Sequence, residues 1–300
     1  MNQLETFNQY RSLLFAIAYR MLGSAMDAED IVQETFLRWQ QVNPMQVESP
    51  KAYLTTITTR LCLDQLRSAR AQREVYVGPW LPEPLLTESA PDSAEIAGLA
   101  DSLSMAFLVL MERLSPVERA VYLLREVFDY DYSEIACIVG KSQVYCRQIV
   151  SRARQHLASH RPRYEVLPGQ HQRLSQQFAQ ACFGGDLPGL MAVLAEDIVL
   201  QSDGGGKIKA AMRPIYSPNR VARFLLGILS KIPPGFTIRP AQINGQPGFI
   251  IYVDAQPQIV MILDIIGERI GGIYVVVNPD KLLHLGVSNS PINWDSPPVF

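Results

Sequence analysis

The chain has 300 residues, of which 48% are apolar and 19% charged, a composition that excludes a disordered or fibrous protein and suggests about two domains. The formal net charge is −2, so the chain as a whole has no excess of positive charge that would indicate a nucleic-acid or membrane partner. The segment from Ile135 to Tyr164 is the exception, because it holds six Lys or Arg residues and no Asp or Glu.

The four cysteines, Cys62, Cys137, Cys146 and Cys182, are scattered and form no C-x-x-C pair. This spacing predicts free, mostly buried thiols rather than disulfides or a zinc site, and we expect no metal and no cofactor. The N-terminus shows no secretory signal, and apolar runs such as Ile270–Val277 are shorter than the ~20 residues that a membrane-spanning helix requires. We therefore expect a cytoplasmic protein with no membrane partner.

Residues 5–73 are predicted to be helical, because apolar residues recur at spacings of three and four. One stripe consists of Phe7, Tyr10, Leu14, Ala18, Met21 and Leu22, and a second of Ile31, Val32, Phe36 and Trp39. Ser49-Pro50 predicts the start of another helix, with Ser as the N-cap and Pro at the first helical position.

The segment Val75–Ser93 cannot be a continuous helix, because its internal prolines remove backbone donors. It also carries Trp80 and Leu81, which are unusual in a solvated linker. We predict an extended tether that packs against another part of the protein. The alternative is a plain linker with stray apolar residues.

Helices are predicted again from Asp101 to Leu157, where Ser115-Pro116-Val117-Glu118 forms a capping box. Tyr132–Val139 and Gln143–Leu157, separated by a glycine turn, have the lengths of a helix–turn–helix. Helical spacing turns Cys146, Val150, Ala153 and Leu157 inward and leaves Arg and Gln side chains outward. These residue types suit base edges and phosphates, although a solvated basic helix would show the same pattern.

A second tether, Ser159–Gly169, precedes a region of mixed structure. Helices are predicted at Leu174–Phe183, at Leu187–Leu194 and from Ser217-Pro218 to Leu229. Strands are predicted at Phe236–Ile243, Phe249–Val253, Ile259–Ile266 and Ile270–Val277. This order indicates an α+β domain with helices on one face of a curved antiparallel sheet.

The segment Asp27–Trp39 resembles the second conserved region of bacterial sigma factors. Leu114–Arg119, Tyr132–Ala136 and Ser151–Arg154 resemble their fourth region, and the absence of other sigma regions matches the extracytoplasmic-function (ECF) group. The resemblance implies a transcription initiation factor that binds core RNA polymerase at the β′ clamp coiled coil and the β flap. It also implies a factor that recognises the −35 and −10 elements of promoter DNA and melts the duplex.

The resemblance assigns residues to three surfaces. The polymerase-binding set is Asp27, Glu29, Asp30, Gln33, Glu34 and Arg38, of which Arg38 could also be a plain surface charge. The −10 set is Lys51, Tyr53, Thr56, Arg60 and Arg67, of which Tyr53 could equally belong to the core. The −35 set is Lys141, Ser142, Gln143, Arg147, Gln148, Ser151, Arg152 and Arg154.

A narrower resemblance is to the ECF41 or SigJ type of ECF sigma factor, which carries a C-terminal SnoaL-like domain of the NTF2-like fold. It rests on Trp80–Leu85, Asp203–Lys207 and Asn278–Leu282. It implies a domain that regulates the factor in cis by contacting the sigma core or the tether. The residues assigned to this contact are Trp80, Leu81, Pro82, Glu83, Pro84, Asp203, Gly204, Gly205, Gly206, Lys207, Asn278, Pro279, Asp280, Lys281 and Leu282.

The expected organisation is therefore two all-α sigma domains followed by an α+β NTF2-like cone. The expected boundaries are 1–74 for region 2, 75–98 for a linker, 99–160 for region 4, 161–171 for a second linker, 172–290 for the cone and 291–300 for a tail.

Two other functions would account for parts of the sequence. A helix–turn–helix repressor would bind duplex DNA without polymerase, and an enzyme would use Asp203, Asp254 or Asp264 in an apolar pocket. No His lies among the predicted strands, and Gly204-Gly205-Gly206-Lys207 lacks the P-loop spacing. We expect a non-enzymatic domain with no catalytic residues, in which a pocket for a small apolar ligand remains possible.

Overall fold

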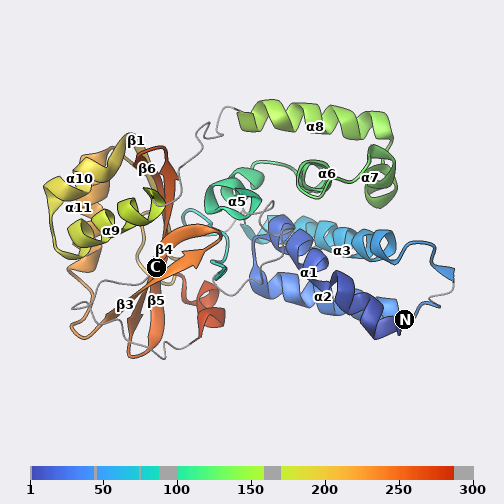
Figure 1. Ribbon diagram of the computed structural model, residues 1–300, viewed down its shortest axis with the longest axis horizontal. Coiled ribbons are helices and arrows are strands. Elements are labelled where there is room, and N and C mark those ends of the chain that lie inside the picture. Colours follow the sequence, from blue (N-terminus) through green and yellow to red (C-terminus); the bar gives the residue numbers. More distant parts are fainter. Residues whose placement is uncertain (1, 44–45, 74–75, 88–100, 159–169, 287–300) are drawn as a thin grey trace. The chain divides into compact units, whose positions relative to one another are not determined.

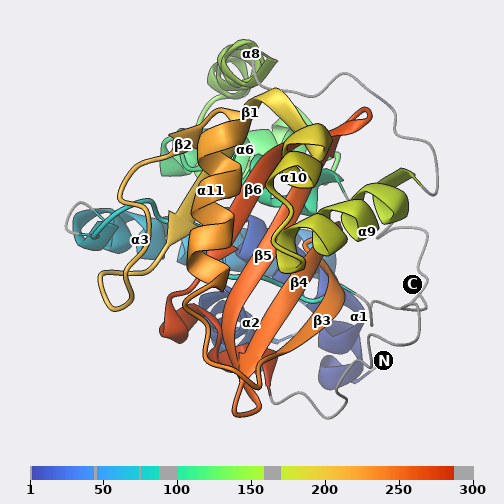
Figure 2. The ribbon, with the colours of Figure 1, turned by 90° about the vertical axis from the view of Figure 1, so that its left-hand side faces the viewer.

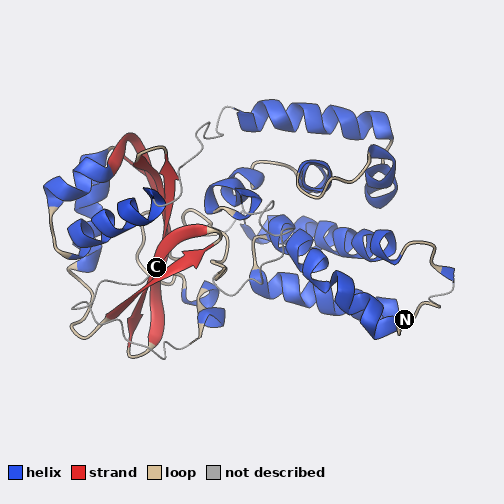
Figure 3. Ribbon diagram, in the orientation of Figure 1, coloured by secondary structure: helices blue, strands red, loops and turns tan. Residues whose placement is uncertain are grey.

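The computed structural model describes residues 2–43, 46–73, 76–87, 101–158 and 170–286 (Figure 1). The chain divides into two compact units, one formed by Met1–Val75 with Phe107–Arg161 and the other by Tyr76–Ala106 with Pro162–Phe300. Figure 3 shows that the strands all fall in the second of these units, whereas the first is helical.

The first unit begins with three helices, α1 (Gln3–Leu22), α2 (Ala25–Gln40) and α3 (Pro50–Arg73). Gly23 ends α1 in the left-handed conformation, and the Ser24 side chain caps α2. Ser49 caps α3 as predicted, because its Oγ accepts the Ala52 N–H at 3.3 Å. The three helices bury a shared cluster of Phe7, Leu14, Val32, Trp39 and Leu54.

Four helices follow, α5 (Met105–Met111), α6 (Pro116–Glu126), α7 (Tyr132–Val139) and α8 (Gln143–Ala158). The capping box predicted at Ser115 and Glu118 is present at the start of α6. Gly140, with a φ of 65°, makes the turn between α7 and α8 and confirms the predicted helix–turn–helix. The inward face of α8 buries Cys146, Val150 and Ala153 as expected, and the side chain of Leu157 lies outside the described residues.

The second unit holds helices α9 (Gln170–Phe183), α10 (Leu187–Val193) and α11 (Pro218–Leu229). Its strands are β1 (Leu194–Asp203), β2 (Ile215–Tyr216), β3 (Thr237–Ile243), β4 (Gln246–Val253), β5 (Gln256–Ile266) and β6 (Arg269–Val276). They form one sheet in the order β2-β1-β6-β5-β4-β3. Short 3₁₀ turns lie at Asp101–Leu103 (η2), Pro279–Lys281 (η3) and Leu283–Leu285 (η4).

The expected four-stranded antiparallel sheet was wrong in two respects. The sheet has two further strands, β1 and β2, and β1 pairs with β6 in parallel. The longest apolar run in β1 is Ile198, Val199 and Leu200, which is too short to indicate a strand in the sequence. Its parallel partner, β6, lies far along the chain, so no hairpin turn in the sequence indicated that the two strands pair.

The core of the second unit lies between the sheet and the three helices, which cover one face of it (Figure 2). Side chains alternate along β1, so Ile198 and Leu200 enter this core while the neighbouring residues face away. The β1–β6, β4–β5 and β5–β6 ladders each shift register once, an irregularity that typically bends strands. This arrangement is the cone with helices on one face that the resemblance implies.

Three of the four thiols are buried as predicted, and Cys137 is exposed. Within the part of the chain that the structure describes, no helix is long and apolar enough to cross a membrane.

Candidate nucleic-acid interface and linker-anchoring site

The acidic residues assigned to polymerase binding lie on the face of α2 that points away from the helical core. Asp27, Glu29, Asp30, Gln33, Glu34 and Arg38 are all exposed or half-buried. Glu29 pairs with Arg11 at 2.6 Å and Glu34 with Arg38 at 2.9 Å, both in solvent-exposed positions. Such pairs contribute little to stability, so this face of α2 remains open to a charged partner.

Two apolar side chains on α2 accompany these acids and were missed in the sequence. Met26 and Leu37 are 50% and 46% exposed, although large apolar residues usually turn inward. The sequence does indicate their exposure, because neither residue falls on the buried stripe of Ile31, Val32 and Trp39. The outward face of α2 is therefore amphipathic, with acids beside exposed apolar groups.

The −10 residues on α3 divide into structural and exposed groups. The Tyr53 ring packs against Trp39 with centroids 5.8 Å apart, at the edge of the helical core. The Thr56 hydroxyl donates to the Ala52 carbonyl at 2.7 Å, and Arg67 pairs with Asp64 at 3.1 Å. Lys51, Arg60 and Arg67 are exposed.

Arg60 and Lys51 also contact the helix–turn–helix. The Arg60 guanidinium donates to the carbonyls of Cys137 and Ile138, each at 3.1 Å, where α7 ends and its dipole favours a cation. The Lys51 ammonium lies 5.5 Å from the centroid of the Tyr130 ring. These two bonds use two of the five N–H donors of the guanidinium, so the exposed remainder of the group can still meet a DNA phosphate.

All residues assigned to the −35 surface are exposed on the turn before α8 or on its outward face. They are Lys141, Ser142, Gln143, Arg147, Gln148, Ser151, Arg152 and Arg154. Ser142 caps α8 by accepting the Tyr145 N–H at 3.2 Å. The Arg147 guanidinium lies 5.1 Å from the centroid of the Tyr132 ring, while Arg154 makes a bidentate pair with Glu126 at 2.8 and 2.9 Å.

Sequence reasoning passed over Val144 and Tyr145 in the first turn of α8, which are 62% and 42% exposed. Their signal lies in the same spacing, because both fall outside the buried stripe of Cys146, Val150 and Ala153. The outward face of α8 thus combines cations and amides with apolar groups that can contact a thymine methyl.

The tether is docked over residues 76–87, as predicted, whereas 88–93 lie outside the described residues. Its first anchor is Asp203, which is fully buried at the end of β1. The Asp203 carboxylate accepts the Tyr76 hydroxyl at 2.6 Å and the Leu81 N–H at 2.8 Å. Burial and the Asp203 carboxylate together raise the pKa of Tyr76 above its usual range, which keeps this hydroxyl a donor.

Lys281, in η3, completes this anchor from the segment after β6, the strand whose end pairs in parallel with the end of β1. Its ammonium donates to Asp203 at 2.7 Å and to the Leu81 carbonyl, and it is only 8% exposed. It also lies 4.1 Å from the centroid of the Trp80 ring, a cation–π contact in a desolvated place. Asn278 donates to the Tyr76 hydroxyl at 2.9 Å. Two segments assigned to regulation from the sequence therefore meet the tether at one cluster.

The glycine loop Gly204–Gly206 passes so close to Asn278 and Asp203 that a side chain on Gly205 would not fit. Gly205 has a φ of 59°, and a Cβ on it would lie 2.3 Å from Asn278 Nδ2. The Gly205 N–H donates to Asp203 at 2.9 Å. Lys207, at the end of the loop, pairs with Asp280 at 2.6 Å on the surface. Of the remaining assigned residues, Pro82, Glu83, Pro84, Gly204 and Leu282 are buried, while Gly206 and Pro279 are exposed.

A second anchor, missed in the sequence, lies at the turn between β3 and β4. Asn244 accepts the Leu85 N–H at 2.9 Å and donates to the Leu103 carbonyl at 3.1 Å. Gln246 accepts the Met105 N–H at 2.8 Å. The Asn-Gly pair at 244–245 indicated a hairpin turn but gave no sign that its amide would bind the linker. Both sides of segment 88–100 are thus attached to the same domain.

The three carboxylates considered for catalysis do not meet in a pocket. Asp203 is committed to the tether, Asp254 is exposed at the β4–β5 turn, and Asp264 accepts the Gln246 side-chain N–H at 2.8 Å. Burial raises the pKa of Asp264 to about 6. In the described ranges, no cluster of three or more metal-ligating side chains occurs.

Comparison with known proteins shows what this architecture is. Residues 6–72 match the Sigma-70 region 2 family and residues 104–157 match the Sigma-70 region 4 family. These stretches contain the acidic face of α2, the exposed residues of α3 and the helix–turn–helix. The chain belongs to the extracytoplasmic-function family of RNA polymerase sigma factors.

The similarity to individual proteins covers both units of the chain. The ECF RNA polymerase sigma factor SigJ of Mycobacterium tuberculosis is 33% identical over 291 residues, covering 93% of each chain. The probable ECF sigma factor SigI of the same species is 31% identical and covers 91% of this chain and 92% of its own. The crystal structure of M. tuberculosis SigJ superposes with a TM-score of 0.75 at 30% identity, covering 93% of this chain and 97% of that one. Sigma factors bind core RNA polymerase and promoter DNA, and the family is non-enzymatic.

Proposed function

We propose that the outward face of α2 binds the β′ clamp coiled coil of core RNA polymerase, with the helix–turn–helix unit contacting the β flap. The support is the exposed acidic surface around Asp30 and Gln33, flanked by the apolar Met26 and Leu37. Complementary charge speeds the formation of a complex that must later dissociate, and the apolar pair adds affinity. Because it would bind core RNA polymerase, we infer that the protein acts in the cytoplasm.

In this proposal α8 reads the −35 element, with Arg147 and Gln148 at base edges, and Lys141 and Arg152 at phosphates. The exposed side chains of α3, chiefly Lys51 and Arg60, support the separated strand at the −10 element. Tyr53 is assigned to the helical core, because its ring packs on Trp39.

We further propose that the C-terminal domain regulates the factor in cis by holding the linker. The carrying observation is the buried Asp203–Lys281 pair, which binds the backbone of Leu81 from both sides. Because linker and domain belong to one chain, their effective concentration is high, and even a weak docking surface would be occupied. A signal that shifts docking would alter the freedom of the linker between region 2 and region 4.

Run-off transcription with core polymerase tests the proposal. The full chain would be compared with chains ending after Leu157 and after Leu282, and with an Asp30→Lys variant. We expect transcripts from the full chain, a different yield after removal of the C-terminal domain, and loss of polymerase binding with Asp30→Lys. A gel shift of duplex DNA that is equally strong without core enzyme would identify a repressor instead. Failure to co-elute with core polymerase would contradict the proposal.

A further inference from the structure

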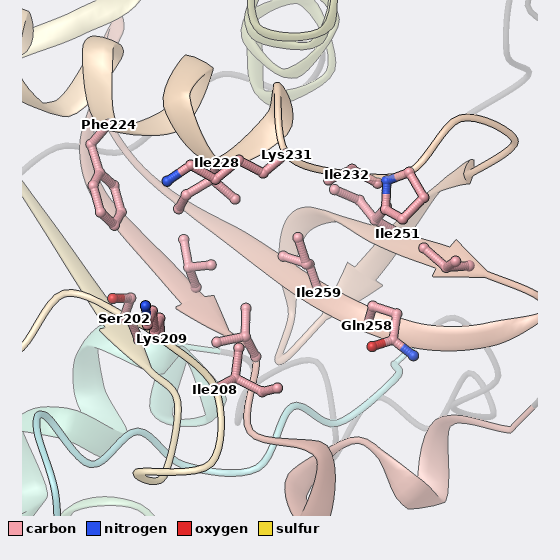
Figure 4. A pocket seen from close by; sticks show the side chains of 15 residues that line it. Ser202, Ile208, Lys209, Phe224, Ile228, Lys231, Ile232, Ile251, Gln258 and Ile259 are labelled. Atoms are coloured by element: carbon pink, nitrogen blue, oxygen red, sulfur yellow. The ribbon is translucent and has the colours of Figure 1, made fainter.

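A cavity of about 490 Å³ opens in the C-terminal unit between α11 and the sheet (Figure 4). Its volume falls within the range of small-molecule sites. Most of its lining is apolar and comes from different elements, with Phe224 and Ile228 from α11, Ile251 from β4, Ile259 from β5 and Val275 from β6. A cavity of this composition suits the apolar body of an organic molecule.

The charged groups in the lining are all positive. Lys209 lies in the loop after β1 and Lys231 lies two residues after the end of α11, and both are exposed. Neither ammonium group makes an ion pair with any residue that the structure describes, and no Asp or Glu lines the cavity. Two cations beside an apolar cavity favour an occupant with a negative end.

A buried hydroxyl adds a donor on the same side. Ser202 is 1% exposed and lines the cavity, and its Oγ accepts the Ala211 N–H at 2.7 Å. The hydrogen of this hydroxyl has no acceptor among the described residues. A buried donor without an acceptor costs free energy, so a ligand oxygen placed here would gain a hydrogen bond that the empty cavity lacks. Lys209 is two residues before Ala211, so cation and donor belong to the same loop.

The loop 204–212 connects this cavity with the first linker anchor. Ile208 and Lys209 line the cavity, whereas a Cβ on Gly206 would lie 3.1 Å from Cβ of Val77 in the linker. Ser202 and Asp203 are consecutive residues of β1, so their side chains point to opposite faces of the sheet. One faces the cavity and the other holds the linker.

We propose that the cavity binds a small amphipathic organic anion, with its apolar body among the isoleucines and a carboxylate at Ser202 and the two lysines. Occupancy shifts the loop 204–212 and thereby changes how firmly residues 76–87 are docked. Any consequence for transcription rests on the proposed function, whereas binding and linker docking can be measured without polymerase.

Calorimetric titration of the full chain with decanoate, below its micellar concentration, tests the binding. Decanol supplies the same apolar body without charge. We expect saturable binding of one decanoate per chain, with decanol at least ~tenfold weaker, as loss of one favourable charge contact predicts. The double variant Lys209→Gln/Lys231→Gln should lose this preference, while Arg220→Gln, an exposed cation of α11 outside the cavity, should keep it. Equal binding of decanol, or no saturable binding, would overturn the proposal.

Hydrogen exchange of peptides covering 76–87, with and without decanoate, tests the coupling. The Leu81 and Leu85 amides report directly, because they donate to Asp203 and Asn244. A severalfold change in their exchange, absent in the double lysine variant, is expected. Binding with unchanged exchange would overturn the coupling. If binding and coupling hold while run-off transcription does not respond to decanoate, it is the regulatory function that fails.

Discussion

Asp203 and Lys281 form an ion pair that is almost completely shielded from water, with side chains 0% and 8% exposed. Taking two charges out of water is costly, and the pair is stable because the linker backbone and the Tyr76 hydroxyl complete the hydrogen bonding around it. Removing one partner would leave the other charge buried and uncompensated. We therefore expect residues from distant parts of the sequence to depend on one another at this cluster.

Asp203→Asn is therefore expected to lower the unfolding free energy by roughly 3–5 kcal/mol, the usual cost of breaking a buried pair. The matched control is Asp280→Asn, which removes an exposed pair with Lys207 and should cost at most about 1 kcal/mol. Denaturant unfolding of both variants measures the difference. Equal losses of unfolding free energy in the two variants would show that the buried Asp203–Lys281 pair contributes no more to stability than the exposed Lys207–Asp280 pair does.

Asp264 predicts a dependence of stability on pH. Its pKa is raised by burial to about 6, so the folded state keeps this proton to a higher pH than the unfolded state does. Its contribution to the unfolding free energy therefore falls as pH rises from about 4 to about 6 and is constant above that. Asp264→Asn removes the titration and keeps an oxygen that can accept from Gln246. The variant should gain on the order of 2–3 kcal/mol over the parent chain between pH 4 and pH 7. Thermal unfolding at both pH values checks this, and a constant difference would refute it.

At the scale of elements, α8 packs against the rest of the helix–turn–helix through Cys146, Val150 and Ala153, which leaves its polar face exposed. The outward cations are not equivalent. Arg154 makes two hydrogen bonds to Glu126, whereas among the described residues Arg147 makes a cation–π contact with Tyr132 and no ion pair. We therefore propose that Arg147, which has no ion pair to break, reads the sequence and that Arg154 positions the helix.

Arg147→Ala should accordingly lower discrimination between −35 sequences by roughly 1–3 kcal/mol, the worth of a bidentate base contact. Arg152→Ala, which removes a phosphate-type cation from the same helix, should weaken transcription evenly across promoters and reduce its salt dependence. Competitive run-off assays with mutated −35 elements measure both effects. An unchanged −35 preference would remove Arg147 from the reading set.

Much of this organisation could be predicted from the sequence, where periodicity and capping residues are local signals. Strands β3 to β6 begin within three residues of their predicted starts, and the helices that follow a Ser-Pro pair begin where Ser49, Ser115 and Ser217 indicate. Strand β1 was missed because Glu196 and Asp197 interrupt its apolar pattern. Of the linker anchor, Asp203 and Lys281 were found through family motifs, whereas Tyr76 and Asn244 gain their partners only from tertiary contacts.

At the scale of the whole molecule, the path from region 2 to region 4 passes through the C-terminal unit. The linker is fixed by Asp203 before residue 88 and by Asn244 and Gln246 on both sides of the segment 88–100. The connection therefore behaves as two held stretches rather than as one flexible chain.

Releasing both anchors should expose the linker to protease. Chymotrypsin has potential sites at Tyr76, Trp80 and Leu85, which are half-buried in the docked state. The double variant Asp203→Asn/Asn244→Ala should be cut between residues 76 and 87 at least ~tenfold faster than the parent chain, because cleavage follows the population of the open form. Mass spectrometry of the early fragments locates the cut. Equal rates would show that these contacts do not hold the linker.

The distance along the chain between Leu81 and Lys281 has a consequence for biosynthesis. The two residues are separated by 200 positions, and β6 must pair with β1 before η3 can reach the linker. At roughly 5–20 residues per second, a ribosome needs on the order of 10–40 s to extend the polypeptide from one to the other. During that interval the linker of the nascent chain has been made but cannot yet bind Lys281. Every newly made molecule therefore passes through a form with an undocked linker before its C-terminal residues are synthesised.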